Sequence, residues 1–191
     1  RTLLVGHSLG DGYYFSYKNK EKPDIDKLKK VMEKAIEDDL IVDIETLSAS
    51  QALTYVEKMK LKDTEKLLKT RNDGAYTFNR IGSALSVSYE PLLPSLKLLE
   101  VWDIMEYGGG ILLRYPQSRD KGKIQPFQDN PLLFKVFEET KEKSKILDVD
   151  SLGALNMKVT EGKIDEVIVL SETLQRRRFS KAAEEIKKRG G

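Results

Sequence analysis

The side chains able to do acid-base or nucleophilic chemistry are few in this sequence. His7 is the sole histidine, and the absence of cysteine excludes disulfides, thiolate zinc sites and cysteine nucleophiles. General acid-base catalysis near neutral pH most often uses histidine. His7 precedes Asp11 and Gly12 in a glycine-rich turn, so we interpret it as a solvated loop histidine and keep it, with Asp11, as a candidate for binding only.

Basic residues offer phosphate-binding chemistry at two places. Arg114 and Arg119 precede Lys121 and Lys123, and guanidinium groups bind the phosphates of a nucleotide or of RNA through charge and paired hydrogen bonds. The alternative is a solvated loop. The triplet Arg176-Arg177-Arg178 would contact either RNA or the acidic surface of another domain, and we favour domain packing.

Two common nucleotide sites and a metal site are excluded by pattern. Neither GxxxxGK[ST] nor GxGxxG occurs, so Gly108-Gly109-Gly110 is interpreted as backbone freedom between two strands and not as a phosphate cradle. We expect no metal site, because the acidic residues near the C-terminal end fall in different predicted elements and are interpreted as surface charges and helix caps. These residues are Asp148, Asp150, Glu161, Asp165 and Glu166.

The bulk composition sets further limits. With 191 residues the chain can form one large domain or two small ones. Its 33 basic and 31 acidic residues give a net charge of +2, so the chain as a whole has no strong electrostatic attraction to nucleic acid or membrane. No apolar run near 18 residues and no signal-peptide pattern occurs, so we expect a cytoplasmic protein without membrane association. Charged residues at 34% are typical of thermophilic proteins. Because the first residue is Arg1, we expect a piece of a longer chain.

The first half of the chain predicts alternating strands and helices. Aromatic alternation at Tyr13, Phe15 and Tyr17 predicts a strand with these side chains in the core. Asp24 opens a predicted amphipathic helix over 25–36, and Leu40 to Ile44 alternate as a strand. Further elements are a helix capped by Ser48 and Gln51, a short helix over 64–68 and strands over 75–81 and 85–89.

The second half predicts two strands and then helices. Apolar runs over 96–104 and 111–115 flank the triple glycine, and Asn130 with Pro131 starts a helix. Helices over 151–157 and 164–188 follow. We therefore expect an α+β fold in which one antiparallel sheet is covered on one face by helices and followed by a mostly helical part. Its strands would be the runs around Tyr13, Val42, Tyr76, Val87, Val101 and Leu112.

The segment SYEPLLPS, residues 88–95, resembles a turn of the threonyl-tRNA synthetase editing domain, Cys-x-Gly-Pro-His-x-Pro-Ser. The prolines and the last serine that shape the turn are kept, whereas Ser88 stands in the place of the Cys and Leu92 in the place of the His. The GxxxxDGYY stretch from Gly6 to Tyr14 is also similar to that family. The resemblance implies the editing-domain fold and aminoacyl ester hydrolysis, for which the turn has lost both chemical groups and the family's HxxxH pair would lie upstream of Arg1.

Later blocks resemble bacterial uridine kinase-like proteins, in which a synthetase-like part precedes a P-loop kinase. These blocks are Leu93–Pro116, QPFQDNPLLFKVFEE at 125–139, SLGALN at 151–156 and the helix at 168–178. The resemblance implies a kinase domain beyond Gly191, which would use ATP and Mg²⁺, whereas this segment itself would need no cofactor. It also implies an editing-like domain over 1–116 and a helical extension over 117–191.

Two functions follow from these resemblances. The first is a noncatalytic part of a uridine kinase-related protein that binds substrate or regulates, with the following kinase domain as its partner and a nucleoside or RNA as its ligand. The second is a tRNA-binding or editing-type hydrolase part that acts on aminoacyl-tRNA. No residue is predicted to be catalytic: Ser88 and Leu92 are degenerate editing positions. The candidate binding residues are His7, Asp11, Tyr13, Ser88, Arg114 and Arg119.

Overall fold

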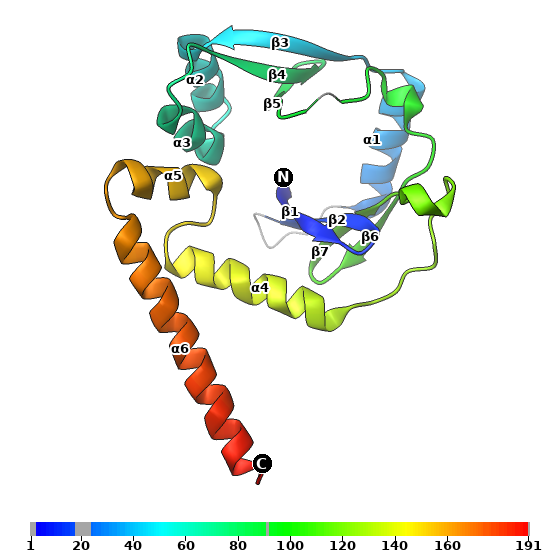
Figure 1. Ribbon diagram of the computed structural model, residues 1–191. Helices are drawn as coiled ribbons and strands as arrows, with labels where there is room; N and C mark the ends of the chain where they lie inside the picture. Colours follow the sequence, from blue (N-terminus) through cyan, green and yellow to red (C-terminus); the bar gives the residue numbers. More distant parts are fainter. Residues whose placement is uncertain (1–2, 18–23, 91, 191) are drawn as a thin grey trace. The chain divides into compact units, whose positions relative to one another are not determined.

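The computed structural model describes residues 3–17, 24–90 and 92–190 and has an α+β fold with antiparallel sheets and a helical C-terminal part (Figure 1). The strands are β1 (Leu3–Leu9), β2 (Gly12–Tyr17), β3 (Val42–Ser48), β4 (Ala75–Ile81), β5 (Ala84–Val87), β6 (Asp103–Tyr107) and β7 (Gly110–Arg114). The helices are α1 (Ile25–Glu37), α2 (Ala49–Lys58), α3 (Lys62–Thr70), η1 (Leu96–Leu98), η2 (Ser118–Asp120), α4 (Pro131–Ile146), α5 (Leu152–Thr160) and α6 (Ile164–Lys188).

The strands form two sheets, whereas the sequence predicted one. β1, β2, β7 and β6 form a four-stranded sheet in that order, and β3, β4 and β5 form a second sheet. Each sheet is built from hairpins that close locally, β1 with β2, β6 with β7 and β4 with β5. The strand predicted over 96–104 is shortened, because 96–98 form η1 and the exposed Val101 lies before β6.

Chain contacts divide the molecule into two compact units. The first holds Arg1–Glu45 and Phe78–Lys135, and the second holds Thr46–Thr77 and Val136–Gly191. The predicted domain boundary after Pro116 stays a prediction. In the first unit α1 packs against β6 and η1, and in the second α3 packs against α2 and α5.

The predicted helix starts are confirmed by their caps. Asp24 accepts the amide of Lys27 at 3.1 Å, and Asn130 Oδ1 accepts the amide of Leu133 at 3.1 Å. Ser48 and Gln51 form the predicted capping box before α2. Such caps satisfy amide groups that a helix start leaves unpaired, typically for about 1 kcal/mol each. Pro23 lies outside the described residues.

The core of the four-stranded sheet depends on close approaches at glycine. A β-bulge sets Gly6 and His7 of β1 opposite Tyr14 of β2, and a Cβ at Gly6 would lie 2.5 Å from the Tyr14 carbonyl oxygen. A Cβ at Gly110 would lie 2.6 Å from the Tyr14 hydroxyl. Tyr14 itself is 2% exposed, whereas Tyr13, Phe15 and Tyr17 are half-buried. The buried aromatic of β2 is therefore Tyr14 and not the predicted stripe.

Candidate functional site

The turn that resembles the editing domain keeps its frame. Pro94 and Ser95 lie beside the segment before β3, where the Val42 amide donates to the Pro94 carbonyl at 2.9 Å and the Leu96 amide to the Leu40 carbonyl at 3.0 Å. The Ser95 hydroxyl donates to the Asp39 carboxylate, which also accepts the Lys97 amide at 3.3 Å. Pro91 lies outside the described residues.

The two chemical positions of this turn are not built into a site. Leu92 is 54% exposed and contributes no polar group. The half-buried Ser88 contacts the Glu90 carbonyl at 3.5 Å, the outer limit of a hydrogen bond. Within the described part of the turn, this contact offers the Ser88 hydroxyl a carbonyl oxygen and not a general base.

His7 lies elsewhere than predicted. It belongs to strand β1 at the bulge and is half-buried, with its ring 5.5 Å from the Tyr14 ring. The interpretation of His7 as a solvated loop residue is therefore wrong. The strand extends through Gly6 and His7 because the bulge absorbs these two residues, and the reversal of direction comes at the predicted Gly10 and Asp11, where Gly10 has a φ of +59°.

Asp11 and Arg114 form a largely buried ion pair in the first unit. Arg114 Nη2 lies 2.5 Å from Asp11 Oδ2 and Nε lies 3.1 Å from Oδ1, a two-pronged pairing of guanidinium with carboxylate. Arg114 is 6% exposed and also donates to the Gln125 carbonyl. The hydrogen bond to Asp11 raises the pKa of Arg114 above its usual value. Both residues were predicted to bind a ligand, but this pairing commits them to holding the loop after β7 against the turn before β2.

A pocket of about 520 Å³ opens above this ion pair. Its polar lining includes Asp11, Arg119, Asp120 and Asp129, and its aromatic lining is Phe127 and Tyr107. The Tyr107 hydroxyl donates to Asp129 Oδ1 at 2.6 Å. Desolvation by burial, reinforced by the hydrogen bond to Asp129, raises the pKa of Tyr107 to about 12, so its hydroxyl remains a donor throughout the neutral range.

An aromatic cluster fixes the wall of this pocket. The Tyr107 ring meets Phe127 at 5.4 Å and Phe134 at 5.1 Å, both edge to face, and Phe134 meets Tyr14 in the same way at 5.1 Å. The Arg114 guanidinium lies over the Phe127 ring, 5.4 Å from its centre. The Tyr14 hydroxyl donates to the Gly108 carbonyl at 3.1 Å. These contacts connect the pocket rigidly to β2 and to the β6–β7 turn.

The structure thus gathers some predicted residues and separates others. Asp11 and the exposed Arg119 line the pocket, with Arg114 next to it, whereas His7, Tyr13 and Ser88 do not line it. Sequence reasoning missed Tyr107, Phe127 and Asp129. A signal was present in the QPFQDNP segment, in which one aromatic residue is surrounded by polar groups just before a capped helix.

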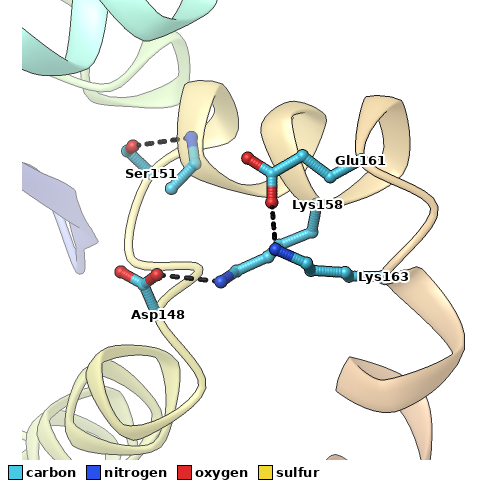
Figure 2. A network of polar contacts seen from close by, with 6 residues as sticks. Asp148, Ser151, Lys158, Glu161 and Lys163 are labelled. Carbon is cyan, nitrogen blue, oxygen red and sulfur yellow. Dashed lines mark hydrogen bonds and ion pairs between the residues drawn. The ribbon is translucent and has the colours of Figure 1, made fainter.

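The second unit carries charges that pair locally. Asp148 pairs with Lys158 and Glu161 pairs with Lys163 (Figure 2), and the nitrogen to oxygen distances are 2.9 and 2.8 Å. The Ser151 hydroxyl accepts the Ala154 amide at the start of α5. The hydrogen bond to Lys158 lowers the pKa of Asp148. Within residues 3–17, 24–90 and 92–190, no three His, Asp or Glu side chains are grouped so as to hold a metal ion.

Of the basic triplet, Arg178 pairs with Glu139 of α4, and Arg176 lies 3.7 Å from Glu172 on its own helix. Both pairs are on the surface. Among the helices that the structure describes, none combines the length and apolar character needed to cross a membrane.

Comparison with known proteins supports a threonyl-tRNA synthetase-like region. The chain is 25% identical over 126 residues to a threonine–tRNA ligase of Carboxydothermus hydrogenoformans. The match covers 64% of this chain and 19% of the ligase, so the chain spans about a fifth of the length of that relative. No family model matches the chain.

Proposed function

We propose that this chain is a noncatalytic, nucleoside-binding part of a uridine kinase-related cytoplasmic protein, built on a threonyl-tRNA synthetase-like fold. The observation that supports the noncatalytic role is the Ser88–Ser95 turn, which is held at Pro94 and Ser95 but carries no acid-base partner around Ser88 and an exposed Leu92. The observation that supports binding is the pocket of Tyr107, Phe127 and Asp129 in the same unit.

The charges of the pocket favour a neutral nucleoside over a phosphorylated ligand. The lining carboxylates of Asp120 and Asp129 stand against the lining guanidinium of Arg119, while the charge of Asp11 is balanced by its pairing with Arg114. Carboxylates accept hydrogen bonds from ribose hydroxyls, and an aromatic ring such as Phe127 offers a surface for a base. Polyphosphates and an RNA backbone would be repelled by this excess of negative charge.

The link to a kinase rests on the order of the sequence blocks at 93–116, 125–139, 151–156 and 168–178. In this proposal ATP and Mg²⁺ belong to a P-loop kinase domain of the same protein, which is also the partner of this part. The pocket would then hold the nucleoside or sense its concentration. The ligand chemistry proposed here depends only on the pocket.

The 126-residue similarity to a threonine–tRNA ligase favours a second candidate, a tRNA-binding or editing-type hydrolase part. That candidate requires recognition of tRNA by a chain whose net charge is +2. Binding to tRNA would show a steep loss of affinity with salt, whereas binding of an uncharged nucleoside would not.

Calorimetric titration tests the proposal. Uridine is expected to bind the unmodified chain saturably, Phe127→Leu and Arg119→Ala to weaken binding at least tenfold, and Arg177→Ala, which removes an exposed arginine elsewhere, to leave it unchanged. Binding of deacylated tRNA in place of uridine, or hydrolysis of seryl-tRNA that Ser88→Ala abolishes, would favour the second candidate and contradict the first.

A further inference from the structure

Helix α6 is long and poorly supported by the rest of its unit. It runs for 25 residues from Ile164 to Lys188, and every residue from Gln175 onward is exposed. Its half-buried positions, Ile164, Val167, Ser171 and Leu174, all lie in the first half. Because helices in water are stabilised mainly by packing of an apolar face, such a surface indicates a partner.

A second apolar stripe follows the exposed side of α6. Ile168, Phe179 and Ile186 are 49%, 65% and 60% exposed, and with Gln175 and Ala182 they recur at spacings of seven, four, three and four residues. This is the spacing of a coiled-coil seam. We call these five residues the α6 seam. By helical periodicity its centre lies about 100° around the helix from Val167 and Leu174. Ala182 also lines a groove together with Glu139 and Ile146 of α4.

The α6 seam is symmetric about Arg177. Ile168 and Ile186 lie nine residues on either side of it, and Gln175 and Phe179 lie two residues on either side. An antiparallel copy crossing there would set Ile168 against Ile186 and Gln175 against Phe179. At five residues on either side, Glu172 would meet the small Ala182, which leaves room for its carboxylate. Arg177 itself lies on the opposite side of the helix and avoids its own copy.

The charges of α6 are unevenly distributed along the helix, in a way that also favours antiparallel pairing. Residues 164–173 carry three acidic side chains and no basic one, and residues 181–188, which an antiparallel copy would set beside them, carry three basic side chains and two acidic ones. In an antiparallel pair the acidic half of each helix lies along the basic half of the other, and in a parallel pair like charges would face each other. Helix α6 is therefore complementary to an antiparallel copy of itself in both apolar spacing and charge. We infer that its binding partner is the same helix of a second chain.

We propose that the chain forms a two-fold symmetric dimer through antiparallel pairing of α6 along the α6 seam. The interface is isologous, so each seam residue is used twice. This role is independent of the nucleoside pocket, because all of its residues belong to the second unit and none lines that pocket.

Sedimentation velocity of the 191-residue chain across a concentration series tests the stoichiometry. A reversible dimer is expected, and Phe179→Asp should raise its dissociation constant at least tenfold. The matched control is Leu170→Asp, because Leu170 is also apolar and 54% exposed but lies on the other side of the helix. A monomer at all concentrations, or equal dissociation by both variants, would overturn the proposal.

Disulfide trapping tests the direction of pairing, and the lack of native cysteine leaves no background. An oxidised mixture of Ile168→Cys and Ile186→Cys chains should give the mixed cross-linked dimer. Neither variant alone should cross-link efficiently, because the two copies of each position would lie about 27 Å apart along an antiparallel pair. Cross-linking of each variant alone without mixed product would indicate a parallel dimer and contradict the proposal.

Discussion

The Ser88–Ser95 turn and the Tyr107–Asp129 pocket belong to the same unit but differ in what their residues hold. The turn has a fixed backbone at Pro94 and Ser95 and an exposed, apolar Leu92 where its resemblance places a histidine. Around the pocket, side chains from distant parts of the chain meet, and Arg114 is 6% exposed. The resemblance to the editing domain thus rests on residues that shape the backbone of the turn. The polar side chains of this unit are concentrated around the pocket instead.

The largest effect should come from the ion pair beneath the pocket. Arg114→Met leaves the half-buried Asp11 carboxylate without its partner and is expected to reduce the free energy of unfolding by about 3–5 kcal/mol. Urea unfolding followed by fluorescence of Trp102, the only tryptophan, measures this in the first unit. The control is Lys29→Met, which removes a more exposed pair with Asp103 and should lose less than about 1 kcal/mol. Equal losses would show that Arg114 is not a structural anchor.

The next effect separates packing from backbone conformation at the β6–β7 turn. Gly108 and Gly109 both have positive φ, but a Cβ at Gly108 would clash with the Phe134 ring, whereas one at Gly109 has nothing within 4 Å. Gly109→Ala should cost about 1 kcal/mol from its backbone conformation alone, and Gly108→Ala about 2 kcal/mol more, because Phe134 must move. Chemical denaturation of both variants measures the difference. Equal costs would mean that Phe134 does not hold the pocket wall.

Much of the helical structure could be predicted because it depends on local signals. Ser48 with Gln51 and Asn130 with Pro131 mark helix starts in the sequence itself, and the apolar periodicity of α6 gave its limits. The pocket depends on residues far apart in the sequence. Asp11 meets Arg114 across 103 residues, and Tyr107 meets Asp129 across 22 residues that include β7 and η2. No periodicity in the sequence indicates contacts between residues that far apart. The bulge at Gly6 and His7 was missed because it depends on pairing with β2.

A smaller effect concerns the hydrogen bond of Tyr107. Tyr107→Phe removes the bond to Asp129 and should lower the free energy of unfolding by about 1 kcal/mol. Because the pKa of Tyr107 in the folded protein, about 12, is raised above its ordinary value of 10.0, this contribution is full below pH 10 and is lost as the pH rises toward 12. Unfolding free energies of both proteins between pH 8 and about 11.5 should therefore converge. A difference that persists at the alkaline end would contradict the assignment.

The smallest effect is expected in the turn. Ser88→Ala should change the free energy of unfolding by less than about 0.5 kcal/mol, because its hydroxyl makes only the long contact with Glu90. Ser95→Ala is the matched change at a shaping position and should cost about 1 kcal/mol through loss of the bond to Asp39. Thermal denaturation of the two variants side by side gives the order. A larger loss at Ser88 would show that this position is still built into a site.

The most direct test of the account is to find where a nucleoside binds. Titration of the isotopically labelled chain with uridine, followed by backbone amide NMR, reports on both regions at once. We predict saturable shifts at Tyr107, Phe127 and Asp129 and none at Ser88 and Leu92. Shifts confined to the turn, with the pocket unchanged, would contradict the claim that the binding chemistry lies in the pocket and that the turn is only a frame.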